Sequence, residues 1–159
     1  AGGGVWTAGA RRAVGITVAD CPSGTVAARR GGVIASVDTG WSGGVQRTAA
    51  EAVGVIGGVS PTAQAWLGPS IRVCCFEVGE EVVDQFRDSS AEAELFVDRT
   101  GVKPHIDLPG LTAALLTERG IAAQNIHDSG RCTRCDGSIF HSYRRDAGRG
   151  GRNLAIAAH

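Results

Sequence analysis

The sequence has no methionine, few aromatic residues and no excess of either charge. Its 159 residues include 16 basic and 16 acidic side chains, so the formal net charge is zero. A neutral chain offers no global electrostatic attraction to nucleic acid or to an anionic membrane. No apolar run reaches the length that spans a bilayer, and no N-terminal stretch has the regions of a secretion signal. We therefore expect a cytoplasmic protein that binds neither nucleic acid nor membrane.

Five cysteines are an odd number, which argues against a fully paired disulfide framework. A reducing compartment is consistent with this count. A chain without methionine that begins with Ala1 and three glycines is typical of a fragment. The length suits one domain with a core of ordinary size. We predict a single domain over residues 1–159.

Apolar runs predict strands and helices that alternate along most of the chain. Buried strands are expected at residues 13–18, 33–37, 63–67, 95–97, 139–144 and 154–158. Helices are expected at residues 45–56, at 80–86, and from Asp107 to a stop at Gly120. The first two strands should form a hairpin-like pair. The pattern predicts an α+β fold, a mixed β-sheet with flanking helices, and not a regular parallel doubly wound sheet.

Short motifs that carry polar or reactive residues follow the chain in a fixed order. Ala19-Asp20-Cys21 ends the first expected strand, and Asp38-Thr39-Gly40-Trp41 ends the second. The later motifs are Gly68-Pro69-Ser70-Ile71, Phe76-Glu77-Val78-Gly79, Cys132-Thr133, Ser142-Tyr143-Arg144-Arg145-Asp146 and Gly151-Arg152. Each motif alone is weakly specific, but together they cover most of the chain.

This series resembles the laccase-domain family, also called the multicopper polyphenol oxidase or YfiH-like family, whose members include purine nucleoside phosphorylases. The family pattern runs from an Ala-Asp-Cys triplet through His-Ala-Gly-Trp and Gly-Pro-x-Ile to Ser-Tyr-Arg-Arg. This chain has Asp38 where the family carries a metal-binding His, and Ser42 where Arg commonly follows the Trp. The resemblance implies one compact domain of the YfiH-like type that lacks the family's N-terminal segment and, with it, an upstream His.

The resemblance implies a site at Cys21 and Asp38, which are the candidate catalytic residues and metal ligands. In the family, the corresponding Cys joins two histidines around zinc or copper. Aspartate also binds zinc, but it favours harder cations than imidazole does. Two protein ligands rarely hold zinc, so we expect zinc or copper binding by this chain alone to be weak or absent. The competing interpretation of Cys21 is a buried thiol that packs as a small apolar side chain.

The C-terminal third supplies candidate anion-binding groups, because guanidinium groups bind phosphate in a bidentate way. Side chains alternate between faces along a strand, so Tyr143 and Arg145 should share one face and Arg144 should take the other. We predict that Arg145, as a catalytic residue, or Arg152 faces the pocket, and that Arg144 does not. The expected substrate-binding residues are Trp41, Ser42, His141, Tyr143 and Arg152.

Each of these assignments has a plainer alternative. The arginines are also consistent with a solvated charged strand, which is the usual state of a surface run. Trp41 is also consistent with packing at the edge of the domain, and His141 with a structural or exposed position.

A second pair of cysteines has the spacing Cys132-x-x-Cys135. As a redox motif it lacks the strand-then-helix context of a thioredoxin-like site. Together with Cys74 and Cys75 it offers four thiolates, although adjacent cysteines disfavour tetrahedral geometry. The resemblance accounts for Cys132 and leaves Cys135 unexplained.

The favoured function is a metal-assisted purine nucleoside phosphorylase- or hydrolase-type enzyme. Phosphate or water would displace the base at the anomeric carbon, so the expected partners are a purine nucleoside and phosphate. Three alternatives stay open: a non-catalytic homologue that binds a nucleoside-like ligand or a partner, a copper-dependent phenol oxidase, and a hydrolase with Cys21 as nucleophile and His141 as base. A chain with four histidines does not resemble a multicopper cluster. The oligomeric state is left open by the sequence.

Overall fold

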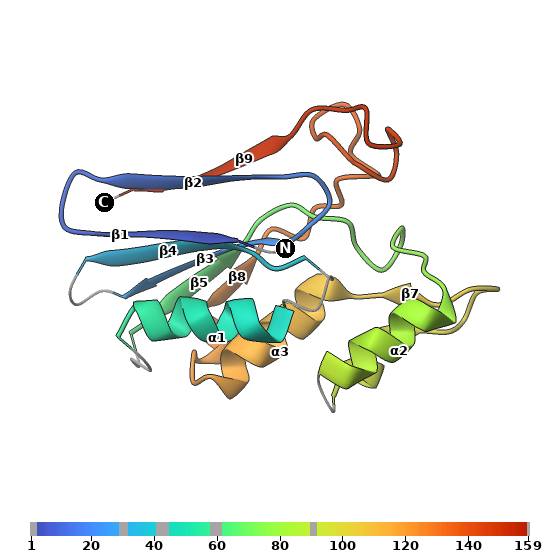
Figure 1. The fold of residues 1–159 in the computed structure, drawn as a ribbon, viewed down its shortest axis with the longest axis horizontal. Helices are drawn as coiled ribbons and strands as arrows, with labels where there is room; N and C mark the ends of the chain where they lie inside the picture. The colour runs from blue at the N-terminus through green and yellow to red at the C-terminus, as the bar shows by residue number, and fades with distance from the viewer. Residues whose placement is uncertain (1–2, 29–31, 41–44, 58–61, 90–91, 159) are drawn as a thin grey trace.

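The computed structural model describes residues 3–28, 32–40, 45–57, 62–89 and 92–158. A five-stranded sheet with the order β1-β4-β3-β5-β8 forms its middle layer (Figure 1). These strands are β1 (Gly4–Ala8), β3 (Ser23–Ala28), β4 (Val33–Asp38), β5 (Gln64–Leu67) and β8 (Ile126–Asp128). Strands β5 and β8 pair in parallel, and the other neighbours pair antiparallel. The mixed sheet of the predicted α+β fold is therefore confirmed.

Further layers cover both faces of this sheet. Strands β2 (Ala13–Val18) and β9 (Asn153–Ala158) form an antiparallel ribbon on one side. Helices α1 (Val45–Val55) and α3 (Leu108–Glu118) lie on the opposite side (Figure 1). Because both faces are covered, β3 and β4 bury most of their side chains, as central strands do in layered folds.

The remaining elements lie towards one end of the sheet. Helix α2 (Glu80–Ser89) buries Val83 and Phe86, which confirms the expected apolar face. The short elements are the 3₁₀ turns η1 (Ala93–Phe96) and η2 (Ala123–Asn125) and the strand pair β6 (Val97–Asp98) and β7 (His105–Ile106). None of the helices in the described ranges is long and apolar enough to cross a membrane.

Two local predictions are wrong. The strand at residues 13–18 does not pair with the strand at 33–37, because β2 pairs with β9 and β4 pairs with β3. Strand β3 was not predicted, because Pro22, Ser23 and Gly24 are residues that commonly end a strand. Residues 139–144 are not a strand but consecutive turns, closed by bonds such as Asp146 N–H to the Ser142 carbonyl.

The expected strand at residues 95–97 is also only partly correct. Leu95 belongs to the turn η1, and 79% of its surface is exposed. Strand β6 begins at Val97. The remaining expected elements are confirmed, including the start of α3, where the Asp107 side chain accepts a hydrogen bond from the Gly110 amide.

Candidate functional site

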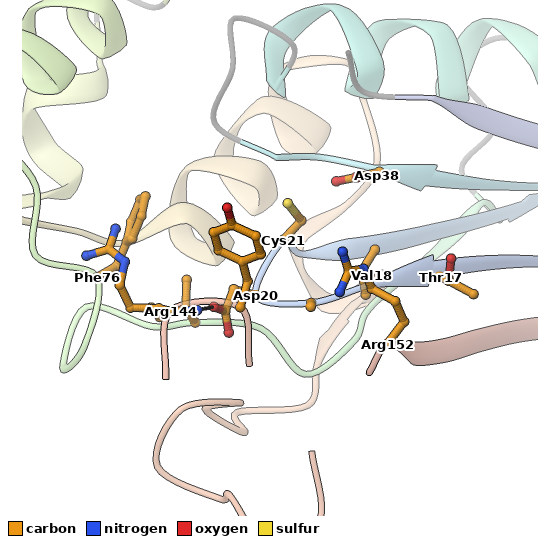
Figure 2. A pocket seen from close by; sticks show the side chains of 11 residues that line it. Thr17, Val18, Asp20, Cys21, Asp38, Phe76, Arg144 and Arg152 are labelled. Atoms are coloured by element: carbon orange, nitrogen blue, oxygen red, sulfur yellow. Dashed lines mark hydrogen bonds between the residues drawn. The ribbon is translucent and has the colours of Figure 1, made fainter. Parts of the chain in front are cut away.

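A pocket of about 360 Å³ opens where β2 ends and β9 begins. Figure 2 shows Phe76 and Arg144 towards one end of the view and Thr17 and Arg152 towards the other. The pocket is lined by Thr17, Val18, Ala19, Asp20, Cys21, Asp38, Ile71, Phe76, Tyr143, Arg144 and Arg152. Its volume lies within the usual range for small-molecule sites. Five separate stretches of chain therefore build one cavity.

Cys21 and Asp38 form one wall of this pocket, as the sequence predicted for their positions. Ser23 pairs with Asp38 in the β3–β4 ladder, so the residues just before β3 lie beside the end of β4. A Cβ atom at Gly40 would lie 2.8 Å from Cys21 Sγ and 3.2 Å from Asp38 Oδ1. Only glycine leaves room for this approach, and its amide donates a hydrogen bond of 2.9 Å to Asp38 Oδ1.

The environment of Cys21 keeps its thiol protonated. Burial raises the pKa of Cys21 from 9.0 to about 12, and the charge of Asp38 and a hydrogen bond to it act in the same direction. A thiolate is disfavoured both by loss of water and by a nearby negative charge. At neutral pH, Cys21 is therefore a hydrogen-bond donor, with Asp38 as its acceptor.

Asp20 holds the pocket together, although the sequence analysis gave it no role beyond its motif. Its side chain is buried and accepts hydrogen bonds from Thr133 Oγ1 at 2.6 Å, Ser142 Oγ at 3.1 Å and the Arg144 amide at 2.7 Å. Its backbone carbonyl accepts from the Ile71 amide at 2.9 Å. A single residue thus fixes the turn after β2 to three other loops.

The arginine prediction is half wrong. Arg144 lines the pocket, Arg152 lines it as expected, and Arg145 does not. The alternation argument failed because residues 142–146 form turns in place of a strand. Arg145 instead links its turn to neighbouring loop residues: it donates to the carbonyl oxygens of Thr133 at 3.0 Å and Phe140 at 2.9 Å. The guanidinium of Arg145 is thus engaged in loop contacts outside the pocket lining.

The two pocket arginines keep their charge available for a ligand. The Arg144 guanidinium lies over the Phe76 ring, 5.4 Å from its centroid, and donates to the Glu77 carbonyl at 2.7 Å. Arg152 donates to the Gly151 carbonyl at 3.1 Å. Among the described residues, these guanidinium groups bond to carbonyl oxygens and to no carboxylate. An anion entering the pocket would meet two guanidinium groups that form no ion pair with a described residue, in a lining that also holds the carboxylates of Asp20 and Asp38.

The other expected substrate-binding residues divide into three groups. Tyr143 lines the pocket and is 58% exposed. His141 is exposed outside the lining, where its amide donates to Asn153 Oδ1 at 2.9 Å. Trp41 and Ser42 lie outside the described residues. Phe76, Thr17 and Ile71 line the pocket and were missed, since nothing in their local sequence separates them from core residues.

The described residues of the pocket do not complete a metal site. Of its three Cys, Asp, Glu or His residues, Asp20 is already engaged with three donors. That leaves Cys21 and Asp38, whereas catalytic zinc uses three protein ligands. Among the residues that the structure describes, the one group of three or more closely spaced potential ligands lies elsewhere. We therefore assign no chemical step in this pocket to zinc or copper.

That other group consists of Cys74, Cys75, Cys132 and Cys135, whose four sulfur atoms lie within 4.8 Å of one another. All four are free thiols. Burial raises the pKa of Cys132, but hydrogen bonds from the Cys135, Arg72 and Arg134 amides outweigh it and lower the pKa to about 7. The four thiols therefore lie close together even though Cys74 and Cys75 are adjacent in the sequence.

Comparisons with known proteins agree with this architecture. The family described as "Multi-copper polyphenol oxidoreductase laccase" matches residues 2–159. "Adenosine deaminase RL5" from an unknown prokaryotic organism is 38% identical over 138 residues, which are 83% of this chain and 52% of that protein. "Purine nucleoside phosphorylase" of Deinococcus radiodurans is 39% identical over 146 residues, 89% of this chain and 54% of that protein.

A solved structure also matches. The crystal structure of the Bacillus licheniformis hypothetical protein YfiH superposes with a TM-score of 0.89 at 26% identity, and covers 98% of this chain and 61% of that chain. The YfiH-like type of fold is thereby confirmed. The chain spans about half the length of the curated relatives described above, at 52% and 54% of theirs.

Replacing Asp20 with Asn should destabilise the protein. An amide has one acceptor oxygen in place of two, so at least one of the three donors loses its partner, at a cost of about 1–3 kcal/mol in the free energy of unfolding. Asn tolerates the positive φ of 78° at this position, so the substitution does not strain the backbone and the lost hydrogen bond accounts for the change in stability. Urea denaturation measures the change.

The matched control is Asp98→Asn, because Asp98 accepts from the Thr100 amide at 2.8 Å on the exposed surface. This control should change the free energy of unfolding by no more than about 0.5 kcal/mol. Equal losses for the two variants would contradict the role given to Asp20.

The Cys21 thiol should react slowly with iodoacetamide at neutral pH, because the thiolate is the nucleophile. Its folded pKa lies above its ordinary value of 9.0, so its contribution to stability is complete below pH 9.0 and is lost as pH rises towards about 12. The Asp38→Asn variant should label faster at a given pH, though not as fast as an exposed thiol, since burial is the larger cause. Mass spectrometry of the Cys21 peptide measures the labelling rate against pH. Asp84→Asn on α2 is the control, and an identical pH profile for Asp38→Asn and the unmodified protein would refute the coupling.

Proposed function

Because this chain belongs to the multi-copper polyphenol oxidoreductase laccase family, we propose that its pocket binds a purine nucleoside together with phosphate and acts on the glycosidic bond. One observation carries the proposal: the pocket combines two guanidinium groups that meet no described carboxylate, aromatic rings, and a thiol–carboxylate pair. The relatives named purine nucleoside phosphorylase and adenosine deaminase support a nucleoside as the ligand. The activity of the whole protein is part of this proposal.

Arg144 and Arg152 are the proposed phosphate-binding groups. Guanidinium groups bind phosphate through paired N–H donors, and both side chains face the same cavity. Phe76 and Tyr143 offer ring surfaces of the kind on which a purine packs. Figure 2 shows Arg144 and Phe76 towards one end of the pocket and Arg152 towards the other, so a phosphate held by both arginines would lie across the cavity beside the aromatic rings.

The pair formed by Cys21 and Asp38 is proposed to hold the sugar. The one hydrogen of the Cys21 thiol is donated to Asp38, and the carboxylate of Asp38 can accept further hydrogen bonds from hydroxyl groups, which a ribose supplies. In phosphorolysis, a phosphate oxygen forms a bond to the anomeric carbon while the bond from that carbon to the base nitrogen breaks. The leaving base takes up the proton that the attacking hydrogen phosphate gives up, and the arginines hold the phosphate in position for attack.

A Cys-nucleophile hydrolase is supported less well. That chemistry needs a thiolate and an adjacent base, but burial and Asp38 raise the pKa of Cys21 to about 12. His141, the expected base, is not among the pocket residues. A second candidate is a nucleoside-binding protein without catalysis. It is favoured because Cys21 and Asp38 offer only two potential metal ligands, whereas catalytic zinc uses three protein ligands.

Calorimetric titration with inosine, adenosine and phosphate tests the proposal. Arg144→Ala and Arg152→Ala should each weaken phosphate binding by about 10- to 150-fold, because a hydrogen bond to a charged group contributes about 1.5–3 kcal/mol. Arg149→Ala is the matched control, since Arg149 is exposed and outside the pocket lining. Unchanged binding in both pocket variants, or no binding by the unmodified chain, would overturn the proposal.

Product analysis then separates the candidate reactions. Free base with ribose 1-phosphate indicates phosphorolysis, and free base with ribose indicates hydrolysis. Inosine formed from adenosine indicates deamination in place of glycosidic cleavage. Binding without any product identifies the non-catalytic candidate.

A further inference from the structure

The four cysteines outside the pocket are arranged more like metal ligands than like disulfide partners. Cys135 Sγ lies 3.4 Å from Cys75 Sγ and 3.7 Å from Cys74 Sγ. A disulfide joins two sulfurs at about 2.05 Å, and it uses two cysteines. Four sulfurs placed tetrahedrally about 2.3 Å from a zinc ion lie about 3.8 Å from one another. The observed separations are close to that second value.

The backbone explains how two adjacent cysteines reach one point. On a strand, Cys74 and Cys75 would point to opposite faces. They lie instead in the turn at residues 73–75, in which the Cys75 and Phe76 amides both donate to the Arg72 carbonyl at 2.8 Å. This turn places the thiols of Cys74 and Cys75 on the same side, where both approach Cys135.

The second pair of thiols comes from a similar turn. The Asp136 amide donates to the Cys132 carbonyl at 3.0 Å, which brings Cys135 back over Cys132. An isolated parallel bridge between Ser70 and Cys132 sets the two turns side by side. Two tight turns that each present two cysteines are a common framework for a structural zinc ion.

The surroundings suit a negatively charged metal–thiolate centre. Backbone amides of Arg72, Arg134 and Cys135 direct hydrogen bonds at the Cys132 sulfur. Donors of this kind orient metal ligands. Arg72 is also held in place by two bonds to Asp128, of 2.9 Å and 2.7 Å.

We propose that Cys74, Cys75, Cys132 and Cys135 bind one zinc ion in a structural site separate from the pocket. A set of four thiolates around one point selects zinc or iron among the common metals. An iron–sulfur cluster would hold its cysteine sulfurs further apart, because iron and sulfide atoms lie between them. This site departs from the expectation of weak zinc binding, which counted only Cys21 and Asp38 as ligands.

The zinc ion would tie together the two loops that close the pocket. The first cysteine pair directly precedes Phe76, and the second pair flanks Thr133, which donates to Asp20. Both loops lack long runs of strand pairing within the described residues. A metal that joins them would stabilise the folded chain, as structural zinc ions do.

Metal analysis of the whole chain, purified without added chelator, tests the assignment. We expect about one zinc per chain in the unmodified protein and close to none in Cys132→Ser and Cys75→Ser. Cys21→Ser is the matched control, because it changes a cysteine outside the cluster, and it should keep its zinc. Zinc content that is unchanged in the cluster variants, or lost equally in Cys21→Ser, would overturn the proposal.

A second measurement uses only the unmodified chain, so its result does not depend on whether the cysteine variants fold. Cobalt(II) exchanged into the protein under reducing conditions should give intense thiolate-to-cobalt charge-transfer bands and the visible bands of a tetrahedral ion. Chelation of the metal should lower the melting temperature. A disulfide between Cys75 and Cys135 in freshly purified protein, or cobalt spectra without thiolate bands, would contradict the zinc site.

Discussion

The buried carboxylate of Asp20 is the interaction on which the pocket depends. It lies at a turn with a positive φ and accepts hydrogen bonds from Thr133, Ser142 and Arg144. A buried charge is stable only when its hydrogen bonds are satisfied, and here three donors satisfy it. Because those donors come from two different loops, the position of Asp20 decides where Cys21 and Arg144 lie in the pocket.

The cysteine cluster and the Asp20 hydrogen bonds act on the same part of the chain. Thr133, which binds Asp20, directly follows Cys132, and Phe76 directly follows Cys75. Strands supply only part of the pocket wall, at the end of β4 in the sheet and at the end of β2 in the ribbon, and loops supply the rest. A site built from loops needs interactions that hold the loops together. In this chain these are the hydrogen bonds to Asp20 and the proposed zinc ion.

Sequence patterns predicted the helices and most strands correctly, because those depend on local periodicity. They also predicted that Cys21 and Asp38 lie close together, although the cause is the pairing of β3 with β4 and not the expected pairing of residues 13–18 with 33–37. They failed for Arg144 and Arg145, because strand alternation was applied to residues that form turns. The cluster of four cysteines was underestimated for the same reason: the direction of adjacent side chains depends on backbone turns that no short motif encodes.

The most direct test of the pocket account is a crystal structure of this chain soaked with a purine nucleoside and phosphate. The account predicts phosphate between Arg144 and Arg152, the base against Phe76 or Tyr143, and ribose hydroxyls within hydrogen-bond distance of Asp38. A ligand bound elsewhere on the surface, with the cavity at Cys21 left to solvent, would contradict it.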